Sequence, residues 1–227
     1  MSNSKFTTVG RKVLMALSGF FLMFFLLQHL TINMLSVVHP DTFNTVSQFM
    51  GSNPVVQGLL QPVLIFAVIF HFIMGIILEL KNNKARSIKY AYNKPGENSN
   101  WMSRYMIYTG GVVFAFLALH FYDFWIPEIN TKFIGGDWTG MHDGHLRFFA
   151  ELKEKFTDPL RVGLYVVAFI FLALHLLHGF QSSFQSVGFN NNKYTPILKK
   201  LGNVFAIVVP AAFAFIAVWH YLTPLSH

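Results

Sequence analysis

The chain has 227 residues, of which 53% are hydrophobic and only 12% charged, and this excludes an ordinary soluble domain, in which roughly a quarter of the residues are charged. It has no cysteine, which excludes disulfides, thiolate zinc or iron–sulfur sites and c-type haem attachment within this chain. The net charge of +7 does not indicate nucleic-acid binding, because the basic residues are segregated by loop as they are in membrane proteins.

Five apolar stretches meet the length of about 20 residues that a membrane-spanning helix needs. In chain order they cover roughly Val13–Val38, Val55–Leu80, Tyr105–Trp125, Val162–Phe184 and Leu201–Leu222. The first is longer than the apolar core of a cleavable signal peptide. The sequence therefore predicts an all-α membrane protein with five transmembrane helices, forming one membrane domain over residues 1–227.

The basic residues predict the orientation of these helices. With the N-terminus in the cytoplasm, twelve Lys and Arg residues fall in the inner segments and five in the outer ones, and the excess marks the cytoplasmic side. The C-terminus is then outside. The long outer segment Ile126–Arg161 is predicted to be a loop punctuated by Pro127, with a short amphipathic helix over Phe148–Phe156.

Four of the five stretches hold a histidine deep inside, which is a functional hypothesis by default. Counted from the predicted cytoplasmic edge, His29 and His120 lie 17 and 16 residues in, whereas His71 and His175 lie 10 and 11 residues in. They form two pairs at matched depth, separated by roughly 9 Å along the membrane normal. Two imidazoles at one level are the ligand set of a bis-histidine haem, and the chain offers it twice.

An internal repeat supports the pairing. Ser18-Gly19 precedes His29 at the same distance at which Thr109-Gly110 precedes His120, and both His71 and His175 are followed four residues later by glycine. Gly19 and Gly110 fall near the depth of the other histidine pair, where small residues would let a flat macrocycle lie against backbone. Helix–helix packing is the alternative use of these glycines.

Two further histidines lie near the ends of the last two stretches, and His178 leaves alternatives open. His178 lies three residues beyond His175 and can share its face, so either can be the ligand; His175 fits the depth and the glycine spacing better. His178 then remains for a haem propionate or a quinone pocket. His220 is expected at the outer interface.

Several polar residues near these levels are candidate contacts, and each is equally explained as an interfacial cap. Ser18, Thr109 and Arg104 are candidates for contacts with the propionates of the inner haem. Gln28 and Asn33 are candidates for the outer haem or for a quinone site, and Asp123 is a candidate for proton exchange with quinone. No dinucleotide-binding or Walker A motif occurs in the sequence, so flavin chemistry must lie elsewhere.

These residues resemble a known family. The segment Gly19–His29, the segment Phe43–Met50 and the run His175-Leu176-Leu177-His178-Gly179-Phe180-Gln181-Ser182 are similar to the cytochrome b subunit of succinate dehydrogenases and fumarate reductases, in the branch with a single five-helix, di-haem chain. The resemblance covers nearly the whole chain. Some relatives carry a proton-moving glutamate two residues before the ligand in the fourth helix, where this chain has Ala173.

The resemblance implies a bundle of four helices that binds two haem b groups, the inner one between His71 and His175 and the outer one between His29 and His120. It implies a bacterial cytoplasmic membrane, a quinone substrate such as menaquinone, and flavoprotein and iron–sulfur partner subunits that carry FAD and the clusters. Two rival interpretations remain. One is a stand-alone b-type electron shuttle, and the other is a haem-free transporter or assembly protein with histidines in packing or proton relay.

Overall fold

The computed structural model describes residues 7–85, 105–189 and 191–223. Five of its helical spans are long and apolar enough to cross a membrane, namely Val9–Val38, Val56–Asn82, Met106–Ile134, Pro159–Ser186 and Thr195–Leu222. The prediction of an all-α membrane protein with five transmembrane helices is confirmed.

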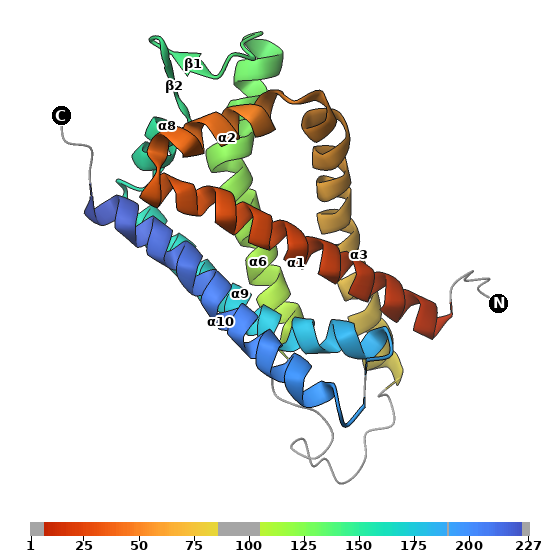
Figure 1. The fold of residues 1–227 in the computed structure, drawn as a ribbon. Coiled ribbons are helices and arrows are strands. Elements are labelled where there is room, and N and C mark those ends of the chain that lie inside the picture. The colour runs from red at the N-terminus through yellow and green to blue at the C-terminus, as the bar shows by residue number, and fades with distance from the viewer. Residues whose placement is uncertain (1–6, 86–104, 190, 224–227) are drawn as a thin grey trace.

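The first span is α1 (Thr8–Val38), whose N-terminus is capped by Thr7 through a 3.1 Å hydrogen bond from the Gly10 N–H. At His39 the chain turns into α2 (Pro40–Ser52), a helix that lies across one end of the bundle (Figure 1). The second span consists of the π-helical turn η1 (Val56–Leu60) and α3 (Gln61–Ala85).

The third span is longer than predicted. It comprises α6 (Met106–His120), the π-helical turn η2 (Phe121–Trp125), α7 (Ile126–Ile129) and a further π-helical turn η3 (Asn130–Ile134). The prediction that a loop begins at Ile126 is therefore wrong. Pro127 has no N–H and its ring would crowd the carbonyl four residues earlier, but the widened turn η2 stands directly before it and leaves room for the helix to continue. The second span places η1 before Pro62 in the same way.

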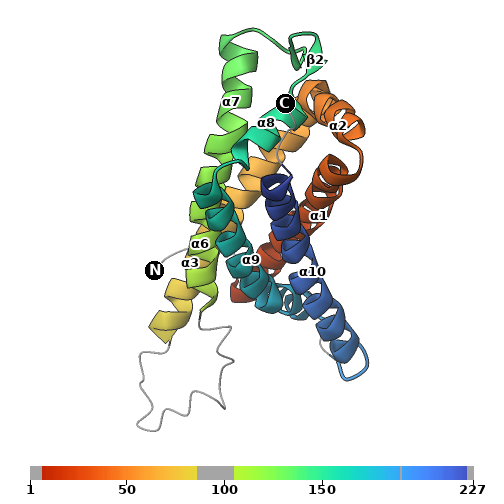
Figure 2. The same ribbon diagram turned by 90° about the vertical axis from the view of Figure 1, so that its left-hand side faces the viewer.

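A short hairpin follows the third span. Strands β1 (Met141–His142) and β2 (His145–Leu146) pair antiparallel, and the two turn residues Asp143 and Gly144 both have positive φ, as a tight hairpin turn requires. The predicted amphipathic helix is confirmed as α8 (Phe148–Lys155). Figure 2 shows that α2, α8 and the hairpin gather at one end of the molecule, which we call the hairpin end.

The last two spans are α9 (Pro159–Ser186) and α10 (Thr195–Leu222), which pack against one another (Figure 1). Asp158 caps α9 by accepting the Leu160 N–H at 2.9 Å. The main buried cluster joins these two helices to α2 and α8 at the hairpin end; its members are Phe43, Leu152, Phe156, Val162, Tyr165, Phe169, Val209, Phe213, Ile216 and Ala217. Many other apolar side chains of the spans are exposed on the outer faces, as expected where lipid is the solvent.

Candidate functional site

The structure brings together the two members of each predicted histidine pair. His29 on α1 and His120 at the end of α6 have ring centroids 5.7 Å apart with an interplanar angle of 87°. His71 on α3 and His175 on α9 have ring centroids 6.3 Å apart at 67°. Each pair thus joins two different spans, and the four spans involved are those in which the sequence places a deep histidine.

Both spacings suit two imidazoles that share one metal ion. A metal ion bonds an imidazole nitrogen at about 2 Å, which places the centres of two such rings roughly 6 Å apart. Within residues 7–85, 105–189 and 191–223, no three His, Asp or Glu side chains are grouped closely enough to hold a metal ion. A pair of imidazoles fits a metal whose other ligands come from a macrocycle, and in this respect the residues present fit haem.

The predicted glycines lie beside the imidazoles of the His71/His175 pair. A Cβ built on Gly19 would lie 3.7 Å from Cε1 of His71, and one built on Gly110 would lie 3.3 Å from Cε1 of His175. The contact at Gly110 is tighter than a side chain normally makes. Both glycines therefore lie beside an imidazole of the other pair. At Gly19 the nearest atom is Oγ of Ser183, 3.1 Å from the built Cβ, so this glycine also lets α1 approach α9 closely.

The predicted hydroxyl residues also contact this pair. Ser18 Oγ lies 3.0 Å from Nδ1 of His71, and Thr109 Oγ1 lies 3.3 Å from Nδ1 of His175. Both residues were candidates for propionate contacts, and the structure gives their hydroxyls an imidazole neighbour instead. Arg104, the third candidate, lies outside the described residues.

The His29/His120 pair has a different, mainly aromatic environment. The ring of Phe25 stacks on His29 at 5.4 Å, and Phe116 and Phe124 flank His120 at 5.9 and 5.3 Å. The amide nitrogen of Asn33 donates to the backbone carbonyl of His29 at 2.8 Å. Within the described part of the chain, Nδ1 of His120 is buried and has no hydrogen-bond partner.

The remaining candidates are distributed along these helices. His175, rather than His178, turns its ring toward His71, and His178 lies about one turn further along α9. Gln28 is exposed on α1. These positions leave His178 and Gln28 outside the two imidazole pairs.

Asp123 is enclosed by protein groups. It lies in η2 and is only 2% exposed. Its carboxylate accepts a 2.8 Å hydrogen bond from the Tyr165 hydroxyl and forms a 2.9 Å ion pair with Arg161. Neither partner is predicted from the sequence. The available signal for one of them is Arg161, which stands at the start of the fourth apolar stretch, near the predicted depth of Asp123.

His220, which is expected at the outer interface, is buried within the protein. It is 1% exposed, with Nε2 2.8 Å from Oγ of Ser36. The rings of Phe149 and Phe156 cover it. Helix α8 folds back over the end of α10, and the sequence pattern of α10 alone does not reveal this cover.

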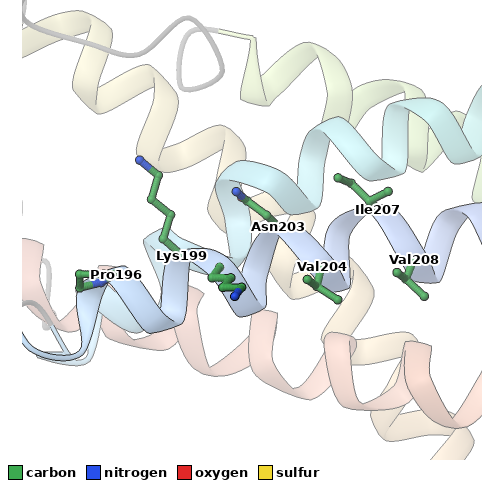
Figure 3. A pocket seen from close by; sticks show the side chains of 7 residues that line it. Pro196, Lys199, Asn203, Val204, Ile207 and Val208 are labelled. Carbon is green, nitrogen blue, oxygen red and sulfur yellow. The ribbon is translucent and has the colours of Figure 1, made fainter.

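A shallow hollow lies on the surface of α10 (Figure 3). Its volume is about 530 Å³. It is lined by Pro196, Lys199, Lys200, Asn203, Val204, Ile207 and Val208. None of these lining residues is a predicted site residue.

Comparison with known proteins gives one curated relative. The succinate dehydrogenase cytochrome b558 subunit of Bacillus subtilis (strain 168) is 22% identical to the chain over 194 residues, which is 85% of this chain and 84% of the relative. No protein-family model and no solved structure matches the chain. The match supports the resemblance to cytochrome b subunits of succinate dehydrogenase that the spacing of histidines and glycines indicates.

Proposed function

We propose that the chain is the cytochrome b membrane anchor of a succinate:quinone oxidoreductase, binds two haem b groups, and carries electrons between an iron–sulfur partner subunit and quinone. The observation that carries the proposal is the meeting of four histidines, from four spans, in two pairs with the spacing of shared metal ligands. The named relative, matched over most of both chains, supports the same function.

His71 and His175 would hold the inner haem, and His29 and His120 the outer one. Haem supplies reversible one-electron transfer when bound. The chain contributes the axial nitrogens and, around His29 and His120, a shell of aromatic side chains that keeps water away from the imidazoles. Such a dry environment is one of the means by which a protein tunes a bound metal.

The other catalytic parts belong to partners. The chain has no cysteine and no dinucleotide-binding motif, so the iron–sulfur clusters would lie in one partner subunit and FAD in another. Both partners would lie on the cytoplasmic face of a bacterial membrane. In this orientation the N-terminus is cytoplasmic and the C-terminus is outside. The sequence and the fold are compatible with succinate oxidation and with fumarate reduction.

Quinone chemistry, with menaquinone the expected quinone, would take place on this chain. The candidates are Gln28, Asn33, Asp123 and His178. In the structure Asp123 is bound by Arg161 and Tyr165, and Asn33 donates to the His29 carbonyl. A direct role of Asp123 in proton exchange would require this ion pair to open.

Single alanine variants test the ligand assignment. We expect His71→Ala and His175→Ala to lose the inner haem and keep the outer one, and His29→Ala and His120→Ala to do the reverse. His178→Ala, one turn from His175 on the same helix, is the matched control and should keep both. Haem content and optical spectra of the purified complex measure this, and full haem content in all four ligand variants would refute the assignment.

A further inference from the structure

The two hydroxyls beside the inner pair, Ser18 and Thr109, have the same hydrogen-bond geometry. The Ser18 hydroxyl lies 2.8 Å from the Met15 carbonyl, three residues earlier on α1, and the Thr109 hydroxyl lies 3.0 Å from the Met106 carbonyl, three residues earlier on α6. Each also contacts Nδ1 of the facing histidine. The same arrangement thus occurs once in each half of the internal repeat.

The direction of these hydrogen bonds follows from counting protons. A hydroxyl has one proton to donate, and a backbone carbonyl can only accept. Because Ser18 and Thr109 donate to the carbonyls, they can only accept from the imidazoles. This assigns the proton of His71 and His175 to Nδ1, which in a neutral imidazole leaves the lone pair on Nε2.

We infer that Ser18 and Thr109 are positioning residues that fix His71 and His175 in the tautomer whose Nε2 binds the inner haem iron. This inference rests on the proposed function. A hydrogen bond from the second ring nitrogen sets the orientation of a metal-bound imidazole and raises its basicity. A more basic ligand favours the ferric state, so the two hydroxyls should lower the reduction potential of the inner haem.

Within the residues that the structure describes, the outer pair of His29 and His120 has no comparable hydroxyl contact. Nδ1 of His120 is buried and has no partner within the described residues. Asn33 approaches both ring nitrogens of His29 only at 3.4 Å. The two levels therefore differ in how their ligands are oriented, and removal of a hydroxyl should affect the inner level alone.

The test compares Ser18→Ala and Thr109→Val with Ser18→Thr and Thr109→Ser, which keep the hydroxyl. In the assembled complex we expect the first two variants to bind the inner haem about 10- to 100-fold more weakly and to shift its reduction potential upward, and the conservative variants to resemble the wild type. The control is Ser186→Ala, which removes a half-buried hydroxyl on α9 that donates to the Ser182 carbonyl.

The outer haem in the same sample reports whether each variant folds. The inference would be overturned if the inner haem of Ser18→Ala and Thr109→Val had the same affinity and the same reduction potential as the inner haem of Ser186→Ala. Equal loss at both levels would also overturn it, because it would indicate a structural role. Failure of the proposed function would give a different result from failure of this inference, because the wild-type complex itself would then contain no haem.

Discussion

Gly110 and Gly111 are neighbours on α6 with very different surroundings. A Cβ on Gly110 would lie 3.3 Å from Cε1 and 3.6 Å from Nδ1 of His175, whereas a Cβ on Gly111 would meet no atom within 4 Å. Alanine favours a helix over glycine by about 1 kcal/mol at either position. A comparison of the two substitutions therefore isolates the contact with His175.

We expect Gly110→Ala to displace the His175 ring and to weaken binding of the proposed inner haem roughly tenfold, the effect expected when the orientation of a metal ligand is disturbed. Gly111→Ala should leave haem binding unchanged. Haem content at limiting haem supply, together with the optical bands of the inner haem, measures the difference. Equal haem content in the two variants would show that Gly110 serves helix packing alone.

The pairing of the histidines could be predicted from the sequence because depth in a membrane follows from residue count along a helix. The partners of individual side chains could not, because they depend on rotamers and on the rotation of each helix. Ser18 and Thr109 therefore lie at the expected level, but their neighbours are imidazole nitrogens and not the propionates that were expected. Arg161 and Tyr165 were missed because contacts between different helices leave no periodic signal in either one.

Glu128 connects separate elements at the hairpin end. Its carboxylate is 2.6 Å from the Lys132 ammonium and 2.5 Å from the Arg147 guanidinium, and these cationic side chains are only 4% and 8% exposed. Lys132 also donates to the Gly51 carbonyl at the end of α2. Burial alone would lower the pKa of Arg147, but its hydrogen bonds to Glu151 and Glu128 more than offset this, and the pKa is raised.

Replacing Glu128 with glutamine should destabilise the fold by about 3 kcal/mol, because it removes the carboxylate shared by two buried cations. The matched control is Glu151→Gln. Glu151 also pairs with Arg147, but its side chain is 43% exposed, so its loss should cost less than about 1 kcal/mol. Unfolding of the purified chain in detergent gives both values, and a Glu128→Gln effect no larger than that of Glu151→Gln would contradict this account.

Hydropathy predicted the five spans but not their ends. Apolar windows detect the part of a helix within lipid, whereas the first and last turns are polar, as in the Lys199-Lys200 turn of α10, which begins at Thr195. The continuation of the third span through Pro127 was missed because a proline followed by Glu128, Asn130 and Lys132 is typical of a loop. No pattern in the sequence predicts the π-helical turn that accommodates Pro127.

At the scale of the whole molecule, the two halves of the internal repeat have equivalent parts. Helices α1 and α3 contribute Ser18, His29 and His71, and helices α6 and α9 contribute Thr109, His120 and His175. Each histidine pair takes one residue from each half. Both pairs therefore form where the two halves meet, and α10, which has no counterpart in the repeat, packs against α9 and α1.

The most direct test of this account is the dithionite-reduced minus oxidised optical spectrum of the purified complex, with its haem-to-polypeptide ratio. The account predicts two haems per chain with the bands of low-spin bis-imidazole haem, both of them reducible by succinate or oxidisable by fumarate through the partner subunits. A colourless polypeptide, obtained from cells supplied with ample haem and otherwise correctly folded, would contradict it.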